Sequence, residues 1–256
     1  MSEKKKNMLE IKGLIKHFGG LAAIDGLDMT INQGEIVGII GPNGAGKTTL
    51  FNLITGFLHP TEGQILFEGR DIIGKPPHKI AEKGIIRTFQ LTNLFPQFTV
   101  LENVVASCHM KPRIGFWEGA FHTPGSRKKA EQVLCKSQEI LEFTGLESRA
   151  NQLAGGLSSG WRRTLAIAIA LAASPRLLLL DEPVTTLDPE RVTFIMNLVT
   201  KVRESGVTVA VIEHNMRAIM DYCDRIVVIG FGKKIAEGSP EEIRQHRDVI
   251  KAYLGE

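Results

Sequence analysis

The sequence predicts an α/β fold that contains a parallel β-sheet. Three short apolar runs, at residues 36–40, 177–180 and 207–212, each end in glycine or in charged residues. Strands that are buried on both faces of a parallel sheet have this composition. Between the last two runs, residues 195–199 place apolar side chains at helical spacing, as expected of a helix that covers the sheet. A chain of 256 residues with 43% hydrophobic content can bury such a core.

The start of the chain has a different pattern. Residues 8–12 and 27–31 alternate between apolar and polar side chains, which predicts two strands with one buried face each. Turns are expected at Gly19-Gly20 and at residues 32–34, and residues 63–69 predict a further short strand bounded by glycines. We therefore expect an antiparallel β subdomain here.

A glycine-rich stretch connects the apolar run at residues 36–40 to a helix-prone segment at residues 49–54. It matches the pattern G-x-x-x-x-G-K-[ST], in which backbone N–H groups and the start of a helix surround a polyphosphate. Lys47 is expected to reach the β- and γ-phosphates, and the hydroxyl of Thr48 to bind Mg²⁺. The sequence therefore predicts a site for a nucleoside triphosphate. The residues of this phosphate loop are Gly41, Pro42, Asn43, Gly44, Ala45, Gly46, Lys47, Thr48 and Thr49.

The middle of the chain is less regular. Pro76-Pro77 is expected to interrupt regular structure, and the glycines and prolines of residues 101–125 predict a long loop or insertion. His109 and His122 lie near Cys108 without the paired spacing of a zinc site, so no zinc site is assigned.

Two helices are expected between residues 126 and 171. One begins at Ser126 and has Gly145 as its C-cap, and another has Ser158 as its N-cap and contains the apolar residues 165–171. Beyond the last buried strand, the pattern predicts a β-hairpin and then short helices, at residues 225–236 and 239–254.

Polar clusters follow three of the predicted parallel strands: the phosphate loop, Asp181-Glu182 and Glu213-His214. Ligands of open α/β sheets bind beyond the carboxyl ends of the strands, so all three clusters can face one nucleotide. We expect Asp181 to hold Mg²⁺, Glu182 to polarise the water that attacks the γ-phosphate, and His214 to orient that water or stabilise the transferring charge. Alternatively, Asp181 and Glu182 form the acidic first turn of a helix. The phosphate loop upstream favours the catalytic interpretation.

The order of these motifs is similar to that of ABC-type ATPases, the nucleotide-binding subunits of ATP-binding-cassette transporters. Gln90, in Arg-Thr-Phe-Gln, matches the Q-loop glutamine of that family, and residues 157–161 stand where it has its LSGGQ signature. Asp181-Glu182 matches the end of the Walker B strand, residues 186–188 the D-loop, and His214 the switch histidine. The resemblance covers nearly the whole chain.

The resemblance implies a single ABC ATPase domain with ATP and Mg²⁺ as its cofactors. Residues 1–91 and 173–256 are expected to form the nucleotide-binding P-loop NTPase core with the β subdomain, and residues 92–172 a helical subdomain that carries the signature. Gln90 is implied as a catalytic residue and as a Mg²⁺ ligand. Phe18 is implied to stack on adenine, although a core or turn residue is the alternative.

The resemblance also implies partners. Two subunits, identical or paralogous, would sandwich two ATP molecules, with Ser158 and Gly160 of each contacting the γ-phosphate bound by the other. Integral-membrane permease subunits, and indirectly a periplasmic or extracellular solute-binding protein, are implied, whereas no nucleic acid is expected. The protein would be peripheral, on the cytoplasmic side of the cell membrane.

A narrower resemblance is to the ATP-binding subunits of branched-chain amino-acid importers, a subfamily that also serves urea and short-chain amides. It rests on the long insertion after Gln90 and on residues 232–238 and 249–256. The chain departs from the wider family in two places. Ser159 and Trp161 replace a glycine and a glutamine of the signature, and Thr185-Thr186 replaces small residues of the D-loop.

Two alternatives remain open at this stage: a non-transport ABC protein acting in DNA repair or translation, and a nucleotide-sensing scaffold that does not hydrolyse ATP. A single phosphate loop without sustained heptads disfavours the first, and the presence of both Glu182 and His214 disfavours the second. The net charge of +3 does not by itself indicate nucleic acid or membrane binding, and the three cysteines suit reduced thiols in a cytoplasm. We expect neither a signal peptide nor a membrane span.

Overall fold

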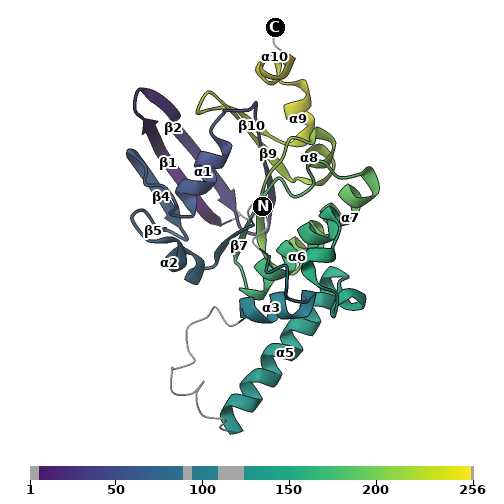
Figure 1. Ribbon diagram of the computed structural model, residues 1–256. Helices are drawn as coiled ribbons and strands as arrows, with labels where there is room; N and C mark the ends of the chain where they lie inside the picture. The colour runs from purple at the N-terminus through teal and green to yellow at the C-terminus, as the bar shows by residue number, and fades with distance from the viewer. Residues whose placement is uncertain (1–5, 89–93, 109–123, 255–256) are drawn as a thin grey trace. The chain divides into compact units, whose positions relative to one another are not determined.

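The computed structural model describes residues 6–88, 94–108 and 124–254 (Figure 1). Backbone contacts divide the chain into two compact units. Unit 1 comprises Met1–Arg87 and Arg176–Glu256, and unit 2 comprises Thr88–Pro175. Each unit has a hydrophobic core of its own. Among the helices that the structure describes, none combines the length and the apolar composition that crossing a membrane requires.

An antiparallel sheet in unit 1 confirms the β subdomain predicted at the start of the chain. Its strand order is β2-β1-β4-β5, and β1 pairs with both β2 and β4. Leu9 and Ile11 lie on the buried face of β1, and a register shift at Gly13, where φ is 53°, returns Leu14 to that face. The strands are β1 (Asn7–Phe18), β2 (Leu21–Asn32), β4 (Glu62–Phe67) and β5 (Arg70–Asp71).

The second sheet of unit 1 contains the three predicted buried strands side by side. Its order is β10-β9-β3-β8-β7-β6, and β3 pairs in parallel with both β8 and β9. Every residue of β3, β7 and β8 is buried, which explains their apolar composition. The strands are β3 (Ile36–Ile40), β6 (Ile85–Thr88), β7 (Leu177–Asp181), β8 (Thr208–Ile212), β9 (Arg225–Gly230) and β10 (Lys233–Gly238).

Several helices of unit 1 begin at side-chain caps. The carboxylate of Asp188 accepts a hydrogen bond from the backbone N–H of Arg191 at the start of α7, and Ser239 forms a capping box with Glu242 at the start of α9. The short helices predicted near the C-terminus are therefore present. These helices are α1 (Lys47–Ile54), α2 (Pro77–Glu82), α7 (Pro189–Glu204), α8 (Met216–Tyr222), α9 (Pro240–Gln245) and α10 (Arg247–Leu254).

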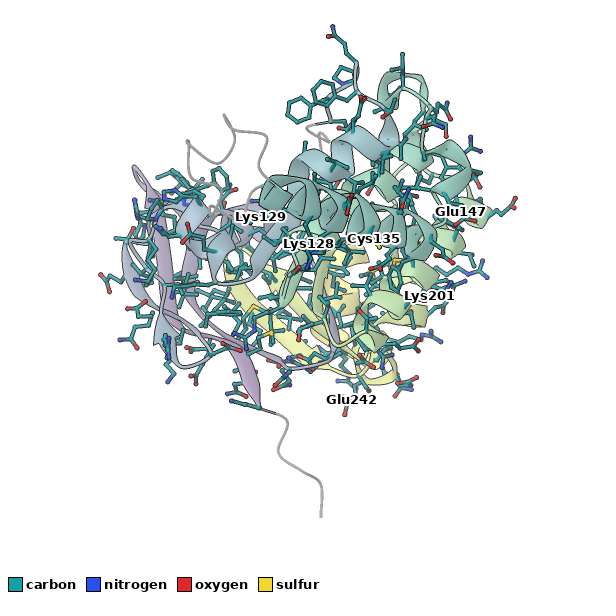
Figure 2. All side chains as sticks on the ribbon, turned by 90° about the horizontal axis from the view of Figure 1, so that it is seen from below. Lys128, Lys129, Cys135, Glu147, Lys201 and Glu242 are labelled. Atoms are coloured by element: carbon teal, nitrogen blue, oxygen red, sulfur yellow. The ribbon has the colours of Figure 1, made fainter. Side chains whose placement is uncertain are left out.

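Unit 2 is helical, and its core lies between α3 (Val100–Cys108), α5 (Pro124–Thr144) and α6 (Ser159–Ala172). Two single turns, η1 (Glu147–Arg149) and η2 (Ala154–Gly156), connect α5 to α6. Gly145 follows α5 with a φ of 70°, as predicted for its C-cap. Lys128 and Lys129, near the start of α5, are exposed (Figure 2).

Two expectations about the middle of the chain were wrong. Residues 101–108 are not a loop but most of α3, because Thr99 and Glu102 form reciprocal hydrogen bonds at its start and Val104 packs into the core. The rest of the predicted insertion lies partly outside the described residues. Pro77 does not interrupt structure but begins α2, since the first helical position needs no N–H donor.

The cysteines are free, as expected. Cys135 on α5 is exposed, Cys108 is half-buried and Cys223 is buried. Burial, with a contribution from the charge of Asp224, raises the pKa of the Cys223 thiol to about 12. Cys223 is therefore protonated and unreactive at neutral pH, whereas Cys135 is accessible to reagents.

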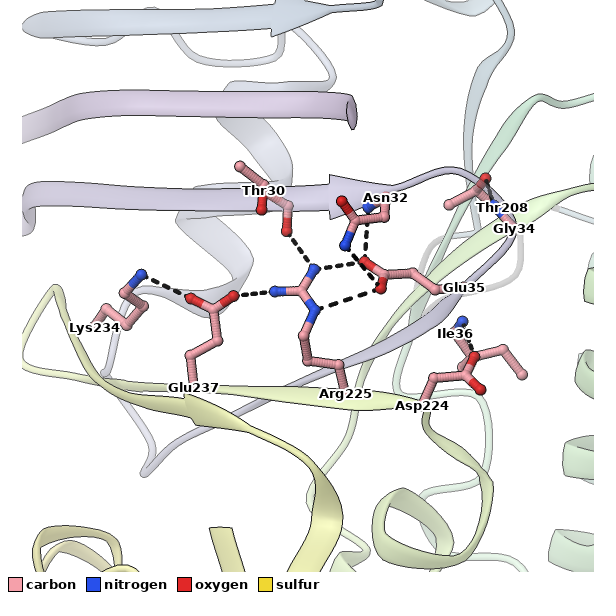
Figure 3. A network of polar contacts seen from close by, with 10 residues as sticks. All are labelled: Thr30, Asn32, Gly34, Glu35, Ile36, Thr208, Asp224, Arg225, Lys234 and Glu237. Carbon is pink, nitrogen blue, oxygen red and sulfur yellow. Dashed lines mark hydrogen bonds and ion pairs between the residues drawn. The ribbon is translucent and has the colours of Figure 1, made fainter. Parts of the chain in front are cut away.

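A network of charges joins the strands at the amino end of the parallel sheet (Figure 3). The guanidinium of Arg225 donates hydrogen bonds to the carboxylates of Glu35 and Glu237 and, over 2.7 Å, to the carbonyl oxygen of Thr30. Glu35 is 2% exposed. Burial lowers the pKa of Arg225, but the hydrogen bonds and charges of Glu35 and Glu237 outweigh that effect and raise it. The network thus ties β2, β9 and β10 to the start of β3.

Replacing Arg225 with alanine is expected to lower the free energy of unfolding by about 3–5 kcal/mol, because Glu35 would remain buried without its charged partner. Urea denaturation followed by circular dichroism measures this. The matched control is Lys234→Ala, which removes the exposed end of the network at Glu237 and should cost at most about 1 kcal/mol. Equal losses in the two variants would contradict a stabilising role for the buried pair.

Candidate functional site

The predicted phosphate loop lies between β3 and α1, and its shape requires glycine. At Gly46, φ is 100° and a Cβ atom would stand 2.4 Å from the carbonyl oxygen of Ala23. At Gly41, a Cβ atom would stand 2.0 Å from the carbonyl oxygen of Ile229. Both glycines therefore allow the loop to approach the backbone of neighbouring strands. No acidic side chain lies in the first turn of α1, so the helix start can receive an anion.

Lys47 lies inside this loop. Its ammonium group donates hydrogen bonds to the carbonyl oxygens of Gly41 and Pro42, over 2.7 and 2.9 Å, and the residue is 6% exposed. Burial lowers the pKa of Lys47, and the charges of Glu182 and Asp181 oppose this shift. The carboxylates at the end of β7 therefore lie close enough to act on the lysine of the loop.

Asp181, the last residue of β7, is 4% exposed. One carboxylate oxygen, Oδ2, accepts a hydrogen bond of 2.6 Å from Arg87, whose guanidinium also donates to the side chain of Asn52 on α1. The other oxygen, Oδ1, is buried and has no hydrogen-bond partner among the described residues. Asp181 thus offers one satisfied and one available oxygen.

The available oxygen fits a Mg²⁺ ligand. Mg²⁺ prefers oxygen ligands and is usually held by one or two carboxylates together with waters and substrate phosphates. In the described part of the chain, no group of three or more histidine, cysteine or acidic residues is arranged to hold a metal by itself. Asp181 and the exposed Thr48, which carries a hydroxyl, therefore suit Mg²⁺ that is bound together with the phosphates of a nucleotide.

Glu182 and His214 meet at the ends of adjacent strands β7 and β8. Nε2 of His214 lies 3.0 Å from Oε1 of Glu182, and their side chains are 36% and 19% exposed. Glu182 has a φ of 51°, a left-handed conformation that costs a non-glycine residue about 1–3 kcal/mol and is concentrated at functional sites. The two predicted catalytic residues are therefore brought together, and both reach solvent.

Phe18 ends β1 and is 48% exposed, so it is not a core residue. The ammonium group of Lys16 lies 5.1 Å from the centre of its ring. The exposed ring leaves area on which a flat group can stack. Gln90 lies outside the described residues.

The predicted signature begins α6 in unit 2. Ser158 is its N-cap, as predicted, but the serine makes no side-chain capping hydrogen bond. Ser158 is exposed and Gly160 is buried in the first turn. Trp161, which replaces the expected glutamine, has the guanidinium of Arg149 4.4 Å from its ring centre. The serine hydroxyl and the helix start are therefore open at the surface of unit 2.

Two polar residues of unit 1 were not given a role from sequence. In the sequence, Arg87 stands out only as part of the segment that contains Gln90, and Glu213 only as the neighbour of His214. The structure shows that each binds residues far away in the chain. For Glu213 the available signal was a charged residue at the end of a predicted buried strand, whereas no strand was predicted at Arg87.

The loop and its lysine follow β3, and Asp181 ends β7, a parallel strand separated from β3 by β8. Loop and carboxylate thus lie at the carboxyl ends of strands in one parallel sheet, which is the architecture of phosphate-loop nucleotide-binding proteins. Residues 24–185 match the family model described as ABC transporter, and residues 233–256 match the model described as branched-chain amino acid ATP-binding cassette transporter. The chain belongs to the ABC transporter family.

Similar proteins are known in sequence and in structure. The chain is 44% identical over 250 residues to the high-affinity branched-chain amino acid transport ATP-binding protein BraF of Pseudomonas aeruginosa, covering 97% of this chain and 98% of BraF. A crystal structure of a nucleotide-free ATP-binding cassette from an ABC transporter matches with a TM-score of 0.85 and 35% identity, covering 98% and 100% of the two chains. A bacterial ABC transporter cassette with a dimeric structure matches with a TM-score of 0.77 and 29% identity, over 91% of this chain and 99% of that chain.

Proposed function

We propose that the chain is the ATP-hydrolysing subunit of an importer of branched-chain amino acids. The observation that carries the enzymatic part is the pair formed by Glu182 and His214 at 3.0 Å beside the strand that leads into the phosphate loop. Similarity to BraF along 97% of the chain supports the cargo. Urea and short-chain amides are the cargo alternatives.

In this proposal the phosphate loop binds the triphosphate of ATP through its backbone N–H groups, and Lys47 leaves the loop carbonyls to reach the β- and γ-phosphates. Phe18 stacks on adenine. Asp181, Thr48 and Gln90 would hold Mg²⁺, which neutralises phosphate charge when it is bound. These residues bind and orient ATP and leave the reaction to a second set of side chains.

Glu182 is the proposed general base. Its carboxylate accepts a hydrogen bond from the attacking water and draws the proton from it as the oxygen approaches the γ-phosphorus. His214 holds the Glu182 side chain in place through the contact between Nε2 and Oε1 and faces the charge that develops on the phosphate oxygens. Gln90 is proposed to act with them in orienting the water.

A second ATP-binding subunit completes each site in the proposal. Ser158 and Gly160 at the start of α6 would contact the γ-phosphate bound by the other subunit, using the open hydroxyl and the N-terminal helix dipole. The dimeric structure of a similar cassette supports this arrangement. The second subunit is an identical or a paralogous ATP-binding subunit.

Membrane permease subunits are the proposed partners, with the chain peripheral at the cytoplasmic face and a solute-binding protein acting on the other side. A docking surface in unit 2 is formed by three exposed apolar side chains, Phe95, Phe98 and Leu153, which are 56%, 44% and 54% exposed. The rings of Phe95 and Phe98 lie 5.1 Å apart. Neighbouring exposed apolar groups of this kind mark interaction sites.

A photoreactive reagent attached to cysteine at Gln97, between the two phenylalanines, is expected to crosslink the protein to a membrane subunit in native membranes. Cys135 would first be replaced by serine, because it is exposed. The matched control is Lys201→Cys, at an exposed position on α7 in unit 1. Mass spectrometry identifies the products. Crosslinking to membrane subunits that is no stronger from position 97 than from position 201 would argue against docking through this surface.

The proposal is tested against its alternatives by purification of the native protein from membranes. Recovery with a polytopic membrane protein, together with ATP turnover, is expected. Recovery with ribosomes or nucleic acid would instead favour the non-transport ABC protein. Nucleotide binding without turnover would favour the sensing scaffold.

A further inference from the structure

We infer that Glu213 is a positioning residue for hydrolysis, whose buried carboxylate joins the segment after β7 to the segment after β8 and so holds Glu182 and His214 together. The inference rests on the proposed function and adds a residue to which that function assigned no role.

The carboxylate of Glu213 is fully buried and is stabilised by hydrogen bonds from uncharged donors. The residue is 0% exposed. In the part of the chain that the structure describes, no lysine, arginine or histidine forms an ion pair with it. A buried carboxylate without a counter-ion is costly unless donors surround it, so its hydrogen bonds are essential to the local structure.

Donors from two loops supply these bonds. From the segment after β7, the backbone N–H of Val184 donates to Oε1 over 2.7 Å, and the hydroxyl of Thr185 lies 3.3 and 3.2 Å from the two oxygens. From the segment after β8, the backbone N–H groups of His214 and Asn215 donate to Oε2 over 2.9 and 3.2 Å. One carboxylate therefore fixes both loops, and hydrogen bonds to an ionised acceptor are the stronger kind.

The two loops carry the catalytic pair. Val184 follows Glu182 by two residues, and His214 directly follows Glu213. The strained backbone of Glu182 needs support from its surroundings, because a left-handed residue persists only where other contacts determine it. The backbone N–H of Glu182 donates to the carbonyl oxygen of Ile212 over 2.8 Å. Two residues further on, the hydrogen bond from Val184 to the Glu213 carboxylate attaches the same segment again.

The inference also gives a role to the hydroxyl of Thr185. Thr185 stands where the family has a small D-loop residue, and its hydroxyl contacts Glu213. A small apolar residue there would leave Glu213 with one donor fewer. Thr185 and Glu213 are therefore expected to act as a coupled pair.

The test is the rate of ATP hydrolysis by purified variants. Glu213→Gln keeps the shape of the side chain but turns one acceptor into an NH₂ group that faces N–H donors, so the loops should separate. A displacement of the catalytic groups by about 1 Å costs about 10²-fold, and a loss of kcat that approaches this size is expected. KM for ATP should stay close to that of the unmodified protein, because the phosphate loop is untouched.

Threonine variants distinguish positioning from general damage. Thr185→Val should lower kcat, Thr185→Ser should retain it, and the effect of Thr185→Val should disappear when Glu213 is already glutamine. The matched control is Thr193→Val, which removes an exposed hydroxyl on α7 that donates to the local carbonyl oxygen of Pro189 and should have no effect on kcat.

The outcomes separate this inference from the proposed function. If Glu182→Gln is inactive while Glu213→Gln and Thr185→Val keep a normal kcat, the positioning role is wrong and the ATPase assignment stands. If Glu182→Gln is itself fully active, the assignment of Glu182 as the general base is wrong, and the positioning role of Glu213, which rests on it, is wrong as well. If Glu213→Gln does not fold, the comparison of Thr185→Val with Thr185→Ser decides, and equal kcat values for the two would overturn the inference.

Discussion

Glu182→Gln is expected to lower ATP hydrolysis by about 10²–10⁴-fold, the range for loss of a general base. The amide keeps the size of the side chain and can still contact His214, but it cannot accept the proton of the attacking water. ATP binding should be retained or strengthened, since Lys47 and Asp181 are unchanged and a negative charge beside the γ-phosphate is gone. Phosphate release gives the rate, and calorimetric titration with ATP gives the affinity. Normal turnover would remove Glu182 from the proposed mechanism.

The same variant tests the shared site. With ATP and Mg²⁺, Glu182→Gln should run as a dimer in size exclusion, whereas the unmodified protein should stay largely monomeric because it hydrolyses the nucleotide that joins the subunits. Adding Ser158→Arg should restore the monomer by placing bulk and a positive charge at the start of α6. A variant that is inactive but monomeric would keep the role of Glu182 and contradict the shared site.

Lys47→Ala is expected to abolish detectable hydrolysis and to weaken ATP binding strongly. The ammonium group is buried against the phosphate loop, and removing one member of a buried charge pair typically costs about 2–5 kcal/mol, or at least about 30-fold in Kd. Calorimetric titration and phosphate release measure both effects.

The control is Lys79→Ala, which removes an exposed lysine paired with Glu82 on α2. It should change neither the rate of hydrolysis nor the Kd for ATP. Turnover close to normal in Lys47→Ala would contradict the assignment of the phosphate loop.

Much of the fold follows from local pattern. The strands β3, β7 and β8 are fully buried, so their composition is apolar throughout and the sequence signals them directly. The start of α3 also has a local signal, the capping box of Thr99 and Glu102, but the glycines and prolines that follow it obscured the helix. The residue type of Pro77 predicts an interruption, but its position at the start of α2 makes proline compatible with the helix. The domain boundaries drawn from the resemblance stay a prediction.

The candidate site, like the fold, could be predicted from the sequence only in part. The phosphate loop could be predicted because its chemistry lies within nine consecutive residues, and the placement of Glu182 beside His214 followed from the rule that strand ends converge. The partners of Arg87 and Glu213 could not be predicted. Arg87 binds Asp181 from 94 positions away, and Val184 binds Glu213 from 29 positions away. Such pairs depend on side-chain packing in the finished sheet, which residue spacing does not encode.

The position of β3 in the sheet has a consequence for how the chain is made. β3 is an early strand, but its neighbours on both sides are β8 and β9, which are formed by Thr208–Ile212 and Arg225–Gly230. During synthesis, β3 therefore has no pairing partner in its sheet until the segments that form β8 and β9 have left the ribosome. Its apolar side chains are exposed during that time. Contacts between such distant segments slow folding and leave edges open to aggregation. The strand that positions the phosphate loop therefore gains its two neighbours only after Thr208–Ile212 and Arg225–Gly230 have been made.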